Sequence, residues 1–211
     1  MIAGVQTGQP VLKVGAAVEE APRAVILVHG RGSSAQAMRP LAEAIDVGDF
    51  NFLLSQAPQA RWYPRSAFEP LELNEPDLSS ALAQIGRLVD ELHDSGIPHG
   101  RIVLGGFSQG ACLASEYAAR NATRYGGLFV LSGALIGPGG TPRDYPGSLA
   151  GTPVFIGSSD VDPWAPYDLV VDTAGVLDGM GASVDLRTYP GTAHTVVQDK
   201  VDAIHGLLAG V

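Results

Sequence analysis

The sequence is poor in basic residues and has a single cysteine, and each shortage argues against a class of protein. Its 211 residues include 13 Lys or Arg against 22 Asp or Glu, which gives a formal net charge of −9. Lys13 and Lys200 are the only lysines. An acidic chain without a basic stripe is a poor partner for nucleic acid or an anionic membrane surface. The lone Cys112 excludes an internal disulfide and a CxxC metal site.

Long hydrophobic runs are also missing. No apolar run approaches the length that spans a membrane, and the N-terminus lacks a basic region followed by an apolar core. We therefore expect a cytoplasmic protein with no integral membrane association. The length and the 45% of hydrophobic residues suit one globular domain over residues 1–211. The oligomeric state leaves no signal in the sequence.

Short apolar runs alternate regularly with amphipathic stretches. Strands are expected at residues 11–18, 24–29, 50–54, 101–107, 127–131, 153–157 and 183–189. Helices are expected at residues 35–46, 77–95, 109–121, 166–180 and 196–209. This alternation predicts an α/β fold with a mainly parallel sheet and helices on both faces. Two longer irregular segments, 55–76 and 137–152, each follow a strand and should lie at the edge of the sheet where ligands bind.

The most informative motif is Gly106-Phe-Ser-Gln-Gly110, between an expected strand and an expected helix. A serine at such a corner adopts a strained backbone that exposes its hydroxyl, and the flanking glycines let strand and helix pass closely. Ser108 is therefore the candidate nucleophile. Because Cys112 lies one helical turn further on, we expect it to be a small core residue.

A serine nucleophile needs a base, usually a histidine oriented by a buried carboxylate. His194 follows the last expected strand and completes the chain order Ser…Asp…His, whereas His29 is expected to be structural. The acid should come from the loop after the penultimate strand, which offers Asp160 and Asp162. We favour Asp162 and keep Asp160 as the alternative.

Hydrolysis also needs donors for the oxyanion of the tetrahedral intermediate. One should be the backbone N–H of Gln109, at the N-terminus of the helix after Ser108. The other should be the backbone N–H of Arg31, in the His29-Gly-Arg-Gly turn. A phosphate-binding loop is disfavoured there, because neither the dinucleotide fingerprint nor the P-loop spacing is present.

These motifs resemble the phospholipase/carboxylesterase family of α/β-hydrolases, which includes bacterial carboxylesterases and acyl-protein thioesterases. The match is carried by His29-Gly-Arg-Gly, Leu104-Gly-Gly-Phe-Ser-Gln-Gly-Ala111, Leu131-Ser-Gly133, Asp162-Pro-x-x-Pro166 and Tyr189-Pro-Gly-x-x-His194. The resemblance implies the same triad and oxyanion donors, and neither a cofactor nor a metal. For a hydrolase of 211 residues we expect no large lid domain.

The chain departs from the family pattern at two places. Members that deacylate proteins commonly have an apolar residue and then Gly-Asp where this chain has Arg31-Gly-Ser33, and the loop with the candidate acids is longer here. Both points weaken a thioesterase assignment, and the second makes the acid ambiguous. The stretch Ala57-Pro…Trp-Tyr-Pro64 resembles the family's segment beside the substrate groove. Trp62 and Tyr63 are therefore candidate substrate contacts, or else aromatics that pin a loop to the core. Trp164, beside the candidate acids, is a third candidate contact.

The sequence thus predicts a serine carboxylesterase that acts on small soluble esters through an acyl-enzyme. The alternatives are a thioesterase or lysophospholipase with the same triad, a peptidase or acyltransferase on the same fold, and a non-catalytic binding protein that kept the hydrolase fold.

Overall fold

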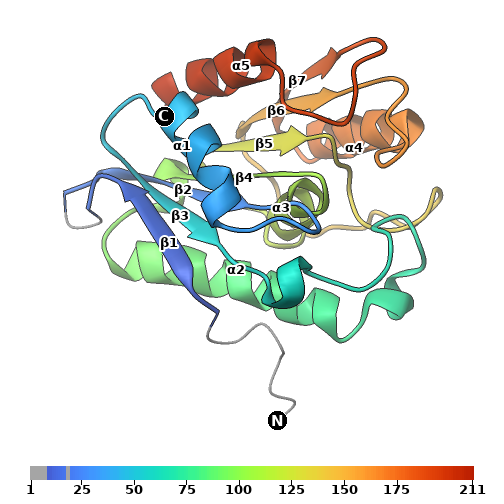
Figure 1. Cartoon of the computed structure of the whole chain (residues 1–211), viewed down its shortest axis with the longest axis horizontal. Helices are drawn as coiled ribbons and strands as arrows, with labels where there is room; N and C mark the ends of the chain where they lie inside the picture. Colours follow the sequence, from blue (N-terminus) through green and yellow to red (C-terminus); the bar gives the residue numbers. More distant parts are fainter. Residues whose placement is uncertain (1–8, 18–19) are drawn as a thin grey trace.

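A seven-stranded, mostly parallel sheet forms the centre of the molecule (Figure 1). The computed structural model describes residues 9–17 and 20–211. The strand order is β1-β3-β2-β4-β5-β6-β7, and only the pairing of β1 with β3 is antiparallel. The strands are β1 (Val11–Gly15), β2 (Arg23–Val28), β3 (Phe50–Ser55), β4 (Ile102–Phe107), β5 (Gly127–Leu131), β6 (Pro153–Ser158) and β7 (Ser183–Thr188).

The central strands are apolar over most of their length because both faces of the sheet are covered. In β2, Ile26 and Val28 belong to one buried cluster, while Val25 and Leu27 belong to another on the opposite face. This alternation follows from the two-residue period of a strand. The first cluster includes α2 (Asp77–Asp94), α3 (Gln109–Arg120) and α4 (Tyr167–Gly179); the second includes α1 (Arg39–Ile45) and α5 (Gln198–Ala209). Figure 1 shows α1 and α5 side by side on one face.

The predicted fold class and all twelve predicted elements are confirmed, with small changes at their ends. The first helix begins as a short 3-10 turn, Gln36–Met38, and becomes α-helical only at Arg39. Pro40 cannot donate a backbone hydrogen bond, so it is tolerated only in this first turn. The strand expected at 11–18 ends at Gly15, and position 18 lies outside the described residues.

Strands that run in the same direction bring their carboxyl ends to one edge of the sheet. The segments that follow β2, β4, β6 and β7 therefore meet there, and they carry Arg31, Ser108, Asp162 and His194. The irregular segment 55–76 joins them as one wall of a cavity. The other segment, 137–152, follows β5, whose carboxyl end lies at the same edge, but its residues do not line that cavity. No separate lid domain interrupts the order of elements in the described part of the chain.

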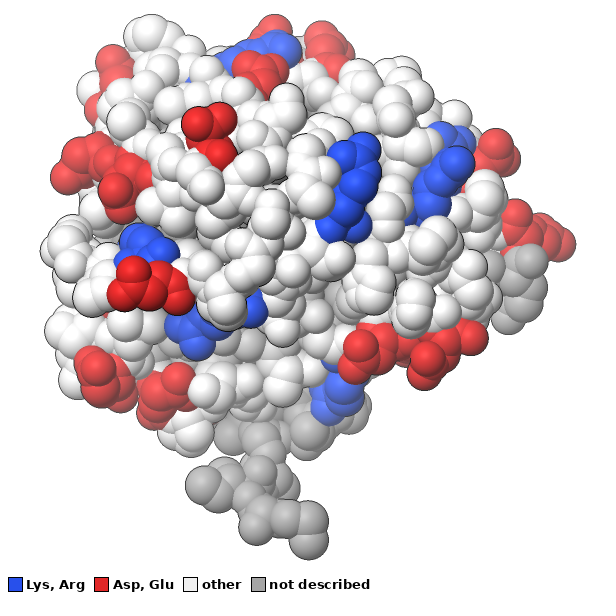
Figure 2. Space-filling model, turned by 180° about the vertical axis from the view of Figure 1, so that it is seen from behind, with Lys and Arg blue, Asp and Glu red and all other residues white. Residues whose placement is uncertain are grey.

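The surface mixes acidic and basic side chains. Figure 2 shows one face on which the blue Lys and Arg side chains lie apart from one another, mostly beside red acidic ones. Within residues 9–17 and 20–211, no helix combines the length and the apolar character needed to cross a bilayer.

Candidate active site

Ser108 lies on a strained corner between β4 and α3, as its motif predicts. Its backbone has φ 55° and ψ −122°, a conformation that is costly for a residue with a side chain. The corner is held in place because Ser108 N–H donates to Leu131 O at 2.8 Å and its carbonyl accepts from Cys112 N–H at 3.1 Å. The corner at Ser108 therefore has the backbone geometry that a nucleophile at the centre of G-x-S-x-G requires.

The two glycines of this motif are explained by how closely the helix passes the neighbouring strand. A Cβ on Gly110 would lie 2.1 Å from Val28 O, and a Cβ on Gly106 would lie 2.6 Å from the same atom. Real side chains do not tolerate such contacts. The glycines thus let α3 begin directly above β2 and β4, which fixes where the hydroxyl of Ser108 emerges.

His194 is paired with Asp162, and the pair is partly withdrawn from solvent. The distance from His194 Nδ1 to Asp162 Oδ2 is 2.6 Å, and the side chain of Asp162 is completely buried. Asp162 Oδ1 also accepts the backbone N–H of Trp164 at 2.9 Å, which fixes the carboxylate. With Nδ1 turned to the carboxylate, Nε2 is the imidazole nitrogen left for the cavity. The ring of Phe107 packs on that imidazole at 4.7 Å between centroids.

Asp160, the alternative acid, has a different partner. Its side chain is exposed, and Oδ1 accepts the backbone N–H of Gly191 at 2.8 Å. Asp160 therefore supports the loop that leads to His194, whereas Asp162 contacts the imidazole itself. Of the two carboxylates, Asp162 has the position that orients a base.

Arg31 and Gln109, the two candidate oxyanion donors, lie in the turn after β2 and at the start of α3. The turn of Arg31 is held by Gly32 N–H, which donates to Ala60 O at 2.7 Å, and by Ser33 N–H, which donates to Gly30 O. Gln109 is the first residue of α3, where a backbone N–H has no acceptor in its own helix. The turn and loop hydrogen bonds of the described residues use neither amide. Both residues line the cavity that contains Ser108.

His29 is a structural residue in the buried turn below Arg31, as expected. Its Nε2 accepts the backbone N–H of Ala57 at 3.0 Å, so Nδ1 carries the proton and donates to Gly30 O at 2.7 Å. Burial lowers the pKa of His29, which favours this neutral form. The imidazole thus connects the turn after β2 to the segment after β3.

Trp62 holds its loop against the core, which is the second of the two roles considered for it. It is completely buried and is not among the cavity-lining residues; its indole N–H donates to His29 O at 2.7 Å. The expected substrate contact of Trp62 is therefore wrong, and the ring fastens the loop to the core. The side chain of Gln109 completes the attachment, because it accepts from Trp62 N–H at 2.9 Å and donates to Tyr63 O at 2.9 Å.

A cavity of about 520 Å³ lies in front of Ser108 and His194. Tyr63 and Trp164, the other two candidate contacts, both line it; Tyr63 is completely buried, whereas Trp164 is 71% exposed at the rim. The full lining is Arg31, Tyr63, Pro64, Arg65, Ser66, Ala67, Phe68, Glu69, Ser108, Gln109, Cys112, Trp164 and His194. One wall is thus a continuous run, residues 63–69, from the segment after β3.

The guanidinium of Arg31 holds this wall, a role that its sequence position does not reveal. Nη1 donates to Pro64 O at 2.9 Å, and Nη2 donates to Tyr63 O at 3.0 Å and also to Arg65 O. The fixed fork of N–H donors on a guanidinium suits it to bind several neighbouring carbonyls at once. The side chain of a candidate oxyanion donor therefore fixes one wall of the cavity that contains Ser108.

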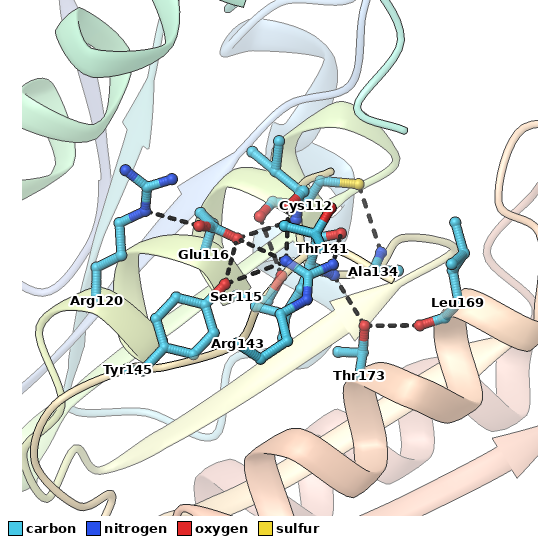
Figure 3. Close-up of polar contacts among 12 residues, drawn as sticks. Cys112, Ser115, Glu116, Arg120, Ala134, Thr141, Arg143, Tyr145, Leu169 and Thr173 are labelled. Atoms are coloured by element: carbon cyan, nitrogen blue, oxygen red, sulfur yellow. Dashed lines mark hydrogen bonds and ion pairs between the residues drawn. The ribbon is translucent and has the colours of Figure 1, made fainter. Parts of the chain in front are cut away.

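Behind Ser108, side chains of α3 and α4 anchor the segment after β5 (Figure 3). Three consecutive backbone N–H groups each find a buried acceptor: Ala134 donates to Cys112 Sγ at 3.4 Å, Leu135 to Thr173 Oγ1 at 2.9 Å, and Ile136 to Glu116 Oε2 at 2.9 Å. Cys112 is thus a core residue, as predicted, and burial raises the pKa of its thiol to about 12.

The remaining histidines lie away from this cavity. His93 and His205 are exposed, and His99 packs against His93 at 4.6 Å between ring centroids. Among the residues that the structure describes, no three His, Cys, Asp or Glu side chains are grouped closely enough to hold a metal ion.

Comparison with known proteins gives one consistent result. The family model for phospholipase/carboxylesterase matches residues 10–210. Acyl-protein thioesterase 1 of Saccharomyces cerevisiae is 26% identical over 90% of this chain and 93% of its own length, and that of Neurospora crassa is 30% identical over 87% and 84%. The crystal structure of a phospholipase/carboxylesterase from Dyadobacter fermentans superposes with a TM-score of 0.92 at 36% identity, over 96% of this chain and 97% of that one.

Proposed function

Because the chain belongs to the phospholipase/carboxylesterase family and has its α/β-hydrolase fold, we propose that it hydrolyses small carboxylic esters through an acyl-enzyme on Ser108. The observation that carries the proposal is the buried contact between Asp162 and His194, whose imidazole lines the same cavity as Ser108. The family establishes a serine hydrolase of esters, and this pair supports the residue roles that we propose within it.

The proposed cycle has two acyl-transfer steps. Ser108 Oγ attacks the ester carbonyl while His194 Nε2 takes the hydroxyl proton of Ser108. The backbone N–H groups of Arg31 and Gln109 stabilise the oxyanion that forms. His194 then gives that proton to the oxygen of the leaving alcohol as the C–O bond breaks. Water, deprotonated by the same imidazole, attacks the acyl carbonyl. The carboxylic acid leaves as the bond to Ser108 Oγ breaks, and His194 returns the proton to that oxygen. Asp162 stabilises the imidazolium in both steps.

The assignment is tested by p-nitrophenyl ester hydrolysis from acetate to palmitate, with three variants beside the wild type. We expect Ser108→Ala to lower kcat by about 10⁴–10⁶-fold and Asp162→Asn by about 10³–10⁴-fold, both with an unchanged fold. Asp160→Asn is the matched control, because the amide still accepts from Gly191 N–H; its kcat should change by only a few-fold. A larger loss in Asp160→Asn than in Asp162→Asn would reassign the acid.

A thioesterase activity at the same site is the second candidate. The relatives described above from two fungi are named acyl-protein thioesterases, and they match most of the chain. The same triad and amides suit a thioester carbonyl equally well. The kcat/KM values for p-nitrophenyl butyrate and for the butyryl thioester of N-acetylcysteamine separate the two, and the larger value names the preferred bond.

We expect short acyl chains to be preferred, because no lid domain is present among the described residues and the volume of the cavity is moderate. Turnover of emulsified palmitate esters well above that of butyrate esters would contradict this.

A non-catalytic binding protein is the remaining alternative, and labelling of Ser108 by an organophosphonate would exclude it. The cytoplasmic location stays a prediction.

A further inference from the structure

Lys200, one of the two lysines of the chain, is completely buried in the first turn of α5, behind the loop that carries His194. The other lysine, Lys13, has 49% of its side chain exposed. Burying an ammonium group is costly unless its N–H groups find partners. The proposed catalytic cycle does not use this group, so its burial needs another explanation.

The surroundings of Lys200 match a protonated amine. Its Nζ donates to Thr195 O at 2.8 Å and to Ser132 Oγ at 3.3 Å, and it lies 5.0 Å from the centre of the Tyr189 ring. A carbonyl, a hydroxyl and an aromatic face are one partner for each of the three N–H groups. The aliphatic stem passes Gly157, where a Cβ would lie 3.3 Å from Lys200 Cγ.

The two hydrogen-bond partners belong to segments that the reaction needs held together. Thr195 follows His194 directly, so its carbonyl fixes the loop immediately beside the base. Ser132 is the first residue after β5, has φ 51°, and donates its N–H to Gly157 O at 2.9 Å, which ties it to β6. Lys200 thus attaches the loop that carries His194 to the residue that follows β5 of the central sheet.

The charges around Lys200 are also arranged for a cation. Asp162, from the loop after β6, is the buried carboxylate nearby: burial lowers the pKa of Lys200, and the negative charge of Asp162 opposes that shift. On the outer side, Tyr189 after β7 donates its hydroxyl to Asp199 at 2.6 Å, and Asp199 pairs with Arg187. The imidazole of His194 completes this set of titratable groups.

We propose that Lys200 is a positioning residue for the reaction, whose ammonium group fixes the His194 loop at Thr195 and whose charge offsets Asp162 behind the imidazole. The inference rests on the function proposed above. Two effects follow if the cation is removed. The loop is held less firmly, so kcat falls; and the imidazole keeps its proton to higher pH, because a positive charge that disfavours imidazolium is gone.

The test compares Lys200→Met and Lys200→Arg with Lys13→Met, which is the same substitution at the exposed lysine. The readouts are kcat, KM and the melting temperature, with kcat/KM of p-nitrophenyl butyrate followed from pH 5 to 9. For Lys200→Met we expect kcat to fall roughly 10–100-fold with little change in KM, and the acidic limb of kcat/KM to move up by about half a pH unit or more. Lys200→Arg keeps the positive charge, so the acidic limb of its kcat/KM profile should lie at the same pH as that of the wild type. Lys13→Met should match the wild type throughout.

A Lys200→Met variant that melts early but has the kcat and pH profile of Lys13→Met would overturn the inference, since the lysine would then be only structural. If Lys200→Met does not fold, Ser132→Ala decides: we expect kcat to fall about 3–10-fold with the acidic limb unmoved, as one hydrogen bond is lost and the charge stays. Wild-type kcat in Ser132→Ala would then overturn it. These failures are distinct from failure of the proposed function, in which the wild type is inactive or Ser108→Ala is active.

Discussion

Replacing Glu116 by Gln should destabilise the protein far more than the same change at an exposed glutamate with a similar ion pair. The side chain of Glu116 is only 2% exposed and its carboxylate accepts from three donors: Arg120 Nε at 2.7 Å, Ile136 N–H at 2.9 Å and the Tyr145 hydroxyl at 3.0 Å (Figure 3). Arg143, 11% exposed, lies 3.9 Å away and adds a second positive charge.

The magnitude follows from what glutamine cannot do. Its amide keeps one oxygen, which can serve Ile136 and Tyr145, and turns an NH₂ group toward the guanidinium of Arg120. That loses a charge-assisted hydrogen bond and leaves Arg143 without its counter-charge. Arg120 is 37% exposed and can turn to water, which limits the loss. We expect the free energy of unfolding to fall by about 2–4 kcal/mol, which lowers the melting temperature by roughly 5–15 °C for a chain of this size.

The matched control is Glu43→Gln. Glu43 accepts from Arg39 Nε at 2.7 Å, the same distance, also with a spacing of four residues on a helix, but its side chain is 54% exposed. An exposed pair of this kind contributes little, so the free energy of unfolding should change by less than about 0.5 kcal/mol. Urea unfolding followed by circular dichroism measures both variants. Equal losses in the two variants would refute the reasoning, because burial would then not determine what the Glu116 pair contributes.

Three further predictions concern residues around the cavity. Arg31→Leu keeps the backbone amide but frees three wall carbonyls, so KM for butyrate esters should rise about 10-fold while kcat falls less; a loss confined to kcat would contradict this. Gly110→Ala should prevent folding or lower the melting temperature by more than about 10 °C, because its Cβ would lie 2.1 Å from Val28 O, whereas Gly175→Ala, with nothing within 4 Å on α4, should be neutral or stabilising. Cys112 has its pKa raised by burial from 9 to about 12, so native protein should resist iodoacetamide at pH 8. Its contribution to stability is present below pH 9 and is lost as pH rises toward 12, so Cys112→Ala should lose less stability than the wild type between pH 9 and pH 11 in urea titrations.

The parts of the site that depend on short stretches of sequence could be predicted. Ser108 and its glycines form one motif at one corner, and the strand before it and the helix after it are both strongly patterned. The choice between Asp160 and Asp162 could not be made in this way. Both carboxylates contact the loop after β7: Asp160 binds Gly191 and Asp162 binds His194. The two residues are only two positions apart, and what distinguishes them is the direction in which each side chain points.

The substrate wall shows a different limit. Trp62 and Tyr63 are adjacent and both buried, yet one faces the core and the other lines the cavity. The side-chain amide of Gln109 binds the backbone of both residues and so fixes which ring faces the core and which lines the cavity. The guanidinium of Arg31 adds a contact over more than thirty residues of sequence. Such attachments join segments that no local pattern connects.

Lys200 did leave a signal in the sequence, although a faint one. Lys200, Ile204 and Leu208 follow one another at intervals of four, so they share one face of α5, and the other two are buried core residues. A lysine on the apolar stripe of a helix is costly to bury unless acceptor groups on the sheet or its loops bind its ammonium group. Here the strained Ser132 and the carbonyl of Thr195 do so. A charged residue at a position where the helical pattern calls for an apolar one therefore marks Lys200 as a residue with a special role. In the proposed mechanism, that role is to hold the loop of His194 and to offset the charge of Asp162.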